Sequence, residues 1–267
     1  MVKEWQGQLK RWRKEHSDNY AKTLLNPPTP TTVLKFIPYP GVILLMGERG
    51  MGKSVEAHWI GAALHKAHDI PAVLHLPNIP DKLRKRINSM LPPWMRVVTR
   101  REDWPHGGVV IYDEAAQSAH ARRTQSKDAV ALDNLISISR QRQQTIIFIS
   151  HHSRKLDPNV VHEVDQIHWK QPTYAHQLFE RDEIADFSMK AFDFFVALRE
   201  GAPWRECSER VKRKVKSTTL ALDMQDFKFA TFTNGLPDYW NEDLSCIFQS
   251  IANLTHPEEE RGVPSLR

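Results

Sequence analysis

Cysteine, glycine and long apolar runs are all scarce in this 267-residue chain. Its two cysteines, Cys207 and Cys246, form no CxxC pair, which excludes a disulfide framework and a zinc site of that kind. The longest uninterrupted apolar runs, such as Val42–Met46, have five residues, whereas a membrane-spanning helix needs about 20. The first 20 residues are basic and lack the apolar stretch of a secretory signal. We therefore expect a soluble protein from a reducing compartment.

The chain does contain enough apolar sequence for a folded core. Apolar residues make up 40% and charged residues 26% of it, a composition that excludes a wholly disordered protein. At about 150 residues per domain, the length predicts one large domain, or one domain with a smaller extension. The formal net charge of +5 permits a nucleic-acid partner without requiring one.

The sequence divides into three predicted regions. Residues 1–32 are expected to form a basic amphipathic helix and a linker, because the proline-rich stretch 26–32 interrupts a helical pattern of tryptophan and leucine. Residues 33–175 are expected to form the core domain. Residues 176–267 are expected to form a mixed, partly helical C-terminal extension, which includes a helix over 187–201.

Within the core, apolar strands alternate with helices. Residues 33–47 are predicted to form a strand, a turn and a buried strand. The other predicted strands are 71–77, 95–99, 109–112, 145–150 and 166–170, and the predicted helices are 53–68, 81–91 and 128–142. Strands that are apolar throughout and alternate with helices indicate an α/β fold, with a central parallel sheet between layers of helices.

The strongest motif is GERGMGKS at residues 47–54, which matches the phosphate-binding pattern GxxxxGK[ST]. A predicted strand precedes it and a predicted helix follows it, a context that disfavours a chance match. Backbone N–H groups of such a loop surround phosphates, while Lys53 would reach the β- and γ-phosphates and Ser54 would ligate Mg²⁺. The predicted ATP-binding residues are Gly47, Glu48, Arg49, Gly50, Met51, Gly52, Lys53, Ser54 and Val55.

A second motif, VVIYDEA, ends an apolar strand with Asp113 and Glu114. Asp113 is the predicted second residue of the Mg²⁺ site, and Glu114 is the predicted base that polarises water for attack on the γ-phosphate. An ordinary surface turn is the alternative interpretation, which the P-loop upstream makes less favourable. The adjacent glutamate is typical of ATP hydrolases, and small-molecule kinases do not need it.

The third motif spans residues 139–158, where a strand ends in the polar residues Ser150 and His151. In an ATPase sheet this strand lies between the P-loop strand and the Asp-Glu strand, so that His151 or Ser150 would act as a γ-phosphate sensor. Arg140 and Arg142 precede the strand, and either could act as an arginine finger on the ATP of a neighbouring subunit. The alternative for both arginines is a solvated helix end.

The order of these motifs resembles the FtsK–HerA class of DNA-translocating ATPases, viral genome-packaging ATPases and zonula-occludens-toxin-like phage assembly ATPases. The resemblance covers roughly residues 38–170, and its specific part is SRQRQQ followed by IIFISHHSRKLDPNV. It implies a RecA-like P-loop NTPase of the additional-strand, catalytic-glutamate type. The class usually has glutamine at the sensor position, where this chain has His151. The toxin-like branch normally carries a membrane span, and the lack of one favours a packaging motor.

The class implies a ring of identical subunits, often a hexamer, that threads double-stranded DNA through its pore. Arg122, Arg123 and Lys127 follow the Asp-Glu strand and are candidate pore residues that would contact DNA phosphates. The basic run 209–216 is a further candidate for DNA binding. A solvated loop and a solvated helix face or strand are the respective alternatives.

The sequence thus predicts an ATPase that uses ATP and Mg²⁺ to translocate double-stranded DNA, most simply in viral genome packaging. Its expected partners are further copies of itself, DNA, and a capsid or portal-vertex protein, in the cytoplasm of a host cell or associated with the virion. Two alternatives stay open: an AAA-type helicase loader, and an ATP-gated phage assembly protein. A small-molecule kinase is disfavoured because no lid or acceptor motif is visible.

Overall fold

The computed structural model describes residues 30–77, 79–113, 139–151, 153, 156, 161–174, 180–241 and 243–245. The strands are β1 (Gly41–Met46), β2 (Ala72–His75), β3 (Met95–Val98), β4 (Gly108–Asp113), β5 (Gln144–Ile149), β6 (Gln166–Trp169), β7 (Thr218–Asp223) and β8 (Phe229–Thr233). The helices are α2 (Pro30–Phe36), α3 (Lys53–His68), α4 (Asp81–Asn88), α8 (Asp182–Leu198) and α9 (Glu209–Ser217), with single 3-10 turns η1 (Arg101–Asp103) and η4 (Trp204–Glu206).

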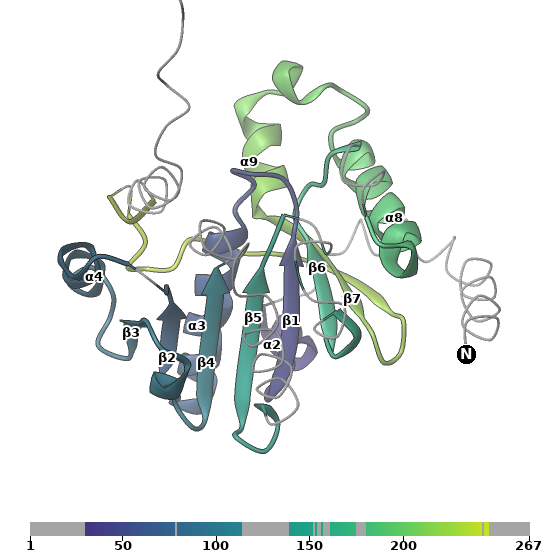
Figure 1. Ribbon diagram of the computed structural model, residues 1–267. Helices are drawn as coiled ribbons and strands as arrows, with labels where there is room; N and C mark the ends of the chain where they lie inside the picture. The colour runs from purple at the N-terminus through teal and green to yellow at the C-terminus, as the bar shows by residue number, and fades with distance from the viewer. Residues whose placement is uncertain are drawn as a thin grey trace, which may run out of the picture.

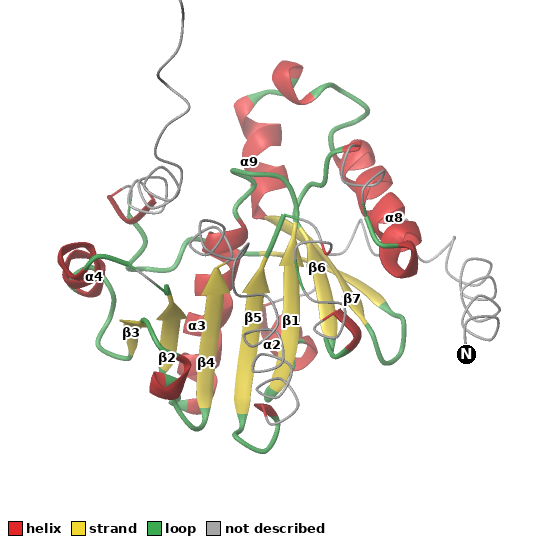
Figure 2. Ribbon diagram, in the orientation of Figure 1, coloured by secondary structure: helices red, strands yellow, loops and turns green. Residues whose placement is uncertain are grey.

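The eight strands of the described residues form one sheet, in the order β3-β2-β4-β5-β1-β6-β7-β8 (Figures 1 and 2). The first six of these are parallel, whereas β7 and β8 are antiparallel to their neighbours. Strand β5 lies between β1 and β4, which confirms the position predicted for it. This order, with the P-loop strand at the centre, is that of a RecA-like P-loop NTPase, so the predicted fold class is confirmed.

Successive side chains of each parallel strand point to opposite faces of the sheet, and helices cover both of these faces. The sheet therefore has an apolar core on each side. One core contains Ile43 and Leu45 of β1 together with side chains of α2, α3 and α4. The other contains Val42 and Leu44 of the same strand together with side chains of α8 and α9. Completely buried strands such as β1, β4 and β5 are the reason for the uniformly apolar runs in the sequence.

The C-terminal part of the chain is joined to the same sheet. Strand β7 pairs with β6, and β8 pairs with β7, so the sheet continues past the P-loop strand into residues beyond 175. Helix α8 corresponds to the expected helix 187–201, but it begins earlier, at Asp182, and also ends earlier, at Leu198. Helix α9 leads directly into β7 and stands above the carboxyl edge of the sheet (Figure 1).

One predicted strand is wrong. Residues 33–36 belong to helix α2 and do not form an extended segment. Val33 and Ile37 are the buried positions of this segment, and their four-residue spacing is that of a helix face. Pro30 is the first residue of the helix, a position at which its lack of an N–H costs no hydrogen bond. Among the described residues, no helix has the length and apolar character that crossing a membrane requires.

Candidate nucleotide-binding site

The motif residues lie at the carboxyl ends of the three central strands, at one edge of the sheet. β1 runs into the loop that starts at Gly47, β5 runs into Ser150 and His151, and β4 ends at Asp113. Because these strands are adjacent and parallel, their carboxyl ends meet. The three motifs are thereby brought together at the edge where ligands of open α/β sheets bind.

In the loop between β1 and α3, Gly47 and Gly52 combine a positive φ with a close approach to a neighbouring carbonyl oxygen. Gly47 has φ 139°, and a Cβ there would lie 2.5 Å from the carbonyl oxygen of Lys170. Gly52 has φ 88°, immediately before the first turn of α3. These are the two glycines that the phosphate-binding pattern requires, and here their role is to let the loop turn tightly against β6 and into the helix. The loop therefore places the N–H groups of the α3 N-terminus at the sheet edge.

Lys53 lies on the first turn of α3 and is directed back over the loop. Its ammonium donates to the carbonyl oxygens of Gly47, at 2.8 Å, and Glu48, at 3.0 Å. Only 8% of the residue is exposed. The Nδ1 atom of His151 lies 3.5 Å from the same ammonium. The P-loop lysine and the predicted sensor are therefore neighbours.

Ser54 and Asp113 form the second contact across the site. The Ser54 hydroxyl donates to Oδ2 of Asp113 over 3.4 Å, and Asp113 is 7% exposed. Hydroxyl and carboxylate oxygens are ligands that Mg²⁺ accepts, with phosphate oxygens and waters completing its shell. In the described ranges no cluster of three or more His, Cys, Asp or Glu side chains could hold a metal ion by itself. The pair thus fits a metal ion that arrives with a nucleotide.

The remaining P-loop residues differ in their exposure. Glu48 is half-buried and its N–H donates to the carbonyl of Gln171, at 3.0 Å, which ties the loop to the end of β6. Arg49 and Gly50 are exposed at the tip, Met51 is buried, and Val55 is half-buried on α3. The loop is therefore attached at its base and open at its tip.

The two candidate finger arginines lie at the other edge of the sheet. Both precede β5, which starts at the amino edge, about 17 Å from the P-loop by the length of a six-residue strand. Arg142 donates to the carbonyl of Trp104, at 3.2 Å. Arg140 forms an ion pair with Asp165, and 72% of its side chain is exposed. Neither arginine reaches the nucleotide site of its own chain, so a finger role requires a neighbouring subunit.

Several predicted residues fall outside the described part of the chain. They are the candidate base Glu114 and the candidate pore residues Arg122, Arg123 and Lys127. The first 29 residues, with the predicted basic helix, and most of the predicted helix 128–142 are also outside it.

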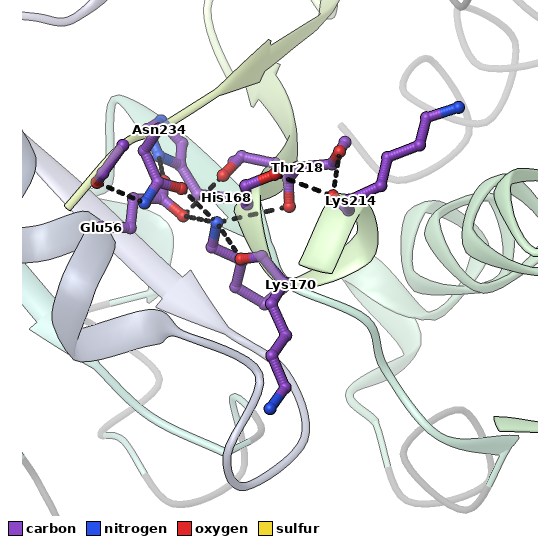
Figure 3. Close-up of polar contacts among 10 residues, drawn as sticks. Glu56, His168, Lys170, Lys214, Thr218 and Asn234 are labelled. Atoms are coloured by element: carbon purple, nitrogen blue, oxygen red, sulfur yellow. Dashed lines mark hydrogen bonds and ion pairs between the residues drawn. The ribbon is translucent and has the colours of Figure 1, made fainter. Parts of the chain in front are cut away.

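A buried ionic cluster behind the P-loop was not predicted from the sequence. Glu56 of α3 accepts hydrogen bonds from His168 of β6, at 2.8 Å, and from the Thr219 hydroxyl of β7, at 2.6 Å. The Lys170 ammonium lies 3.1 Å from Glu56 and also donates to Asn234, at 2.5 Å (Figure 3). Burial alone raises the pKa of Glu56, but Lys170 and His168 outweigh it and leave that pKa below its usual value.

Lys170 also joins the P-loop to helix α9. Its ammonium donates to the carbonyls of Lys216, at 3.2 Å, and Thr218, at 3.3 Å. The carbonyl of Lys216 in turn lies 3.0 Å from where a Cβ of Gly52 would be. The only signals of this cluster in the sequence were a glutamate on the apolar face of a helix and a lysine directly after an apolar strand. Neither signal shows which groups pair.

No family model matches this chain, and no curated protein matches it in sequence. Solved structures similar to it include B204, the DNA-packaging ATPase from Sulfolobus Turreted Icosahedral Virus, at 15% identity and TM-score 0.49, over 74% of this chain and 100% of B204. The KaiC-like protein PH0186 from Pyrococcus horikoshii OT3 is similar at 15% identity and TM-score 0.36, over 50% of this chain and 73% of that one. The N-terminal domain of zonular occludens toxin from Neisseria meningitidis is similar at 18% identity and TM-score 0.30, over 49% and 77%.

Proposed function

We propose that this chain is an ATP-hydrolysing motor that translocates double-stranded DNA, in the packaging of a viral genome. One observation carries the ATPase part of the proposal: Lys53, the Ser54–Asp113 pair and His151 meet at the carboxyl edge of three adjacent parallel strands. A lysine over a glycine loop, an oxygen pair for a metal ion and a polar sensor are the parts that phosphoryl transfer to water requires.

The residues of the site divide the work between binding and hydrolysis. The loop N–H groups and Lys53 bind the phosphates, and Ser54 and Asp113 hold the metal ion. Bound Mg²⁺ supplies positive charge that offsets the charge of the phosphate oxygens. Glu114 follows Asp113 in the chain and is the proposed base that removes a proton from the attacking water. His151 is the proposed sensor, because it lies beside the Lys53 ammonium.

The test of the proposed activity is ATP turnover by the purified protein, alone and with linear duplex DNA, at low and at higher salt. We expect turnover to rise several-fold with duplex DNA and this rise to disappear as salt screens the phosphate contacts. Glu114→Gln should bind ATP but not hydrolyse it, and Lys53→Ala should weaken ATP binding. Glu183→Gln, an exposed carboxylate on α8, is the matched control. Normal turnover in Glu114→Gln would contradict the base assignment.

If duplex DNA does not stimulate ATP turnover, the proposed translocation is contradicted, and the remaining behaviour of the turnover distinguishes the two alternatives. Steady turnover that responds only to a partner protein would favour a helicase loader. Slow turnover that no nucleic acid changes would favour an ATP-gated assembly protein. Either result would leave the ATP site in place and remove translocation from the proposal.

We further propose that Arg140 acts on the ATP of a neighbouring subunit. Its side chain is 72% exposed at the amino edge of the sheet, where it forms an ion pair with Asp165, whereas Arg142 donates to the backbone carbonyl of Trp104. Mixing Arg140→Ala with Lys53→Ala protein should restore part of the turnover, because mixed assemblies contain sites with both residues intact. Mixing that restores nothing, or Arg140→Ala protein with normal turnover, would contradict this role.

A further inference from the structure

Helix α9 has the highest positive net charge of the described helices, and the nucleotide site does not use its cations. Its nine residues carry five cations and one carboxylate, a net charge of +4. Arg210, Arg213 and Lys214 are exposed and follow one another at positions i, i+3 and i+4. They therefore form one stripe along the helix. Figure 3 shows the Lys214 side chain extending away from the buried cluster.

The opposite face of α9 anchors the helix to the protein. Val215 has no solvent exposure and belongs to the core, and Val211 packs against the same core. At the N-terminus the Ser208 side chain accepts a hydrogen bond from the N–H of Val211, at 3.3 Å. The helix is thus fixed with its apolar side inward and its cations outward.

The cations of α9 produce a local positive potential. Glu209, its one acid, pairs with Lys212 at 2.9 Å. A hydrogen bond and the charge of Lys212, with further contributions from Lys216 and Arg213, hold the pKa of Glu209 below its usual value. A surface of this kind attracts polyanions.

The last turn of α9 contacts the nucleotide site, so the basic surface of this helix lies beside that site. The carbonyl of Lys216, in its last turn, packs against Gly52 of the P-loop. The Lys170 ammonium holds the carbonyls of Lys216 and Thr218 and is itself paired with Glu56 of the P-loop helix. A force on α9 would therefore reach the P-loop through buried contacts rather than through a flexible linker.

We propose that the Arg210–Arg213–Lys214 stripe of α9 binds the phosphate backbone of double-stranded DNA beside the nucleotide site. This inference rests on the proposed translocase function and names the surface that contacts its substrate. A membrane surface is a poorer partner for α9, since helices that lie on lipid need a free apolar face, and here that face is buried. Exposed arginines and lysines on a helix bind phosphates without reading bases, as a motor that moves along any sequence requires.

The test compares two charge variants in a duplex-binding experiment without nucleotide. The first is Arg210→Gln, Arg213→Gln, Lys214→Gln on α9. The second is Lys82→Gln, Lys85→Gln, Arg86→Gln, which removes three exposed cations from α4 as a matched control. Glutamine keeps the helix propensity close to that of lysine and arginine. Binding of a labelled 30-base-pair duplex is followed by fluorescence anisotropy over a range of salt concentrations.

We expect the α9 variant to bind the duplex about tenfold more weakly or worse at 0.1 M salt, and its salt slope to fall by about 2 to 3, as for three lost phosphate contacts. The α4 variant should bind as the wild type does. Equal binding by the α9 variant, or an equal loss in the α4 variant, would overturn the proposal. Preferential binding of the wild type to single-stranded RNA or to anionic phosphatidylserine vesicles would also overturn it.

The same samples distinguish this failure from failure of the proposed function. ATP turnover is measured separately for the wild type. If the wild type hydrolyses ATP and binds duplex DNA, and the α9 variant binds duplex DNA equally well, only the proposed role of α9 is contradicted. A wild type that binds no duplex contradicts both α9 and translocation. A wild type without turnover contradicts the motor, while the binding comparison still decides the role of α9.

Discussion

The ammonium of Lys170 lies 3.1 Å from Oε2 of Glu56, and neither side chain has any solvent exposure. Glu56 belongs to the helix that follows the P-loop, and Lys170 follows the strand beside β1. The backbone N–H of Lys170 also donates to the carbonyl of Met46, at 2.8 Å, immediately before the loop. The pair is therefore connected to both ends of the P-loop: Glu56 lies on the helix that follows the loop, and Lys170 is hydrogen-bonded to the residue before it.

Removing one member of this pair is expected to be costly. In Lys170→Met, Glu56 would lose its countercharge inside the protein, which typically destabilises a fold by about 3 to 5 kcal/mol. In the double variant Glu56→Gln, Lys170→Met no charge is left unpaired, so part of that loss should be recovered. Urea unfolding of the wild type, both single variants and the double variant measures the coupling. Additive effects would show that the two groups are not coupled.

Gly52 is expected to tolerate alanine less well than another glycine of similar conformation. Alanine at a left-handed position costs about 1 to 2 kcal/mol, and Gly201 (φ 75°), with nothing within 4 Å, should show only that cost. At Gly52 (φ 88°) the new Cβ would also lie 3.0 Å from the Lys216 carbonyl. We expect Gly52→Ala to unfold more easily than Gly201→Ala and to bind a fluorescent ATP analogue at least about tenfold more weakly. Equal effects at both sites would contradict the close contact.

His151 is expected to act on turnover more than on binding. If it senses the γ-phosphate beside Lys53, His151→Ala should lower kcat by about 100- to 1000-fold, the range found when one positioned polar group is removed. The affinity for ATP should change much less. His162→Ala, at an exposed position, is the control. A rise in KM with unchanged kcat would instead assign His151 to ground-state binding.

Because two histidines are buried, we expect the protein to lose stability in acid. Burial lowers the pKa of His58 to about 3 and, with a contribution from Arg101, that of His75 to about 4. The unfolded chain binds these protons near pH 6.5, so it holds more protons than the folded chain below that pH. The free energy of unfolding should therefore fall as pH decreases from about 6.5 to 4, by up to about 1.4 kcal/mol per pH unit for each group.

Denaturant unfolding at several pH values measures this dependence. His58→Gln should reduce the slope by up to one proton, because one of the two groups no longer titrates. The same substitution at the exposed His162 should leave the slope as in the wild type. A slope that His58→Gln does not change would show that His58 can be protonated within the fold.

Much of the fold could be predicted because the local pattern and the tertiary environment agree. β1, β4 and β5 are apolar throughout since both faces of the sheet are covered, and that composition is visible in the sequence. The helix α2 was missed because a short apolar run has no clear period, and its burial at Val33 and Ile37 depends on packing against the sheet. The roles of Glu114, Arg140 and His151 in hydrolysis stay predictions.

The sequence by itself determined the glycine loop, the lysine that follows it and the acid at the end of a buried strand, because each depends on residues that are neighbours in the chain. Only the tertiary structure decided that Glu56 meets His168, 112 positions away, and that Lys170 joins them. It also decided that α9 packs against the P-loop. Those contacts depend on strand order, which places β6 and β7 beside β1, and strand order results from the packing of the whole sheet rather than from any one segment.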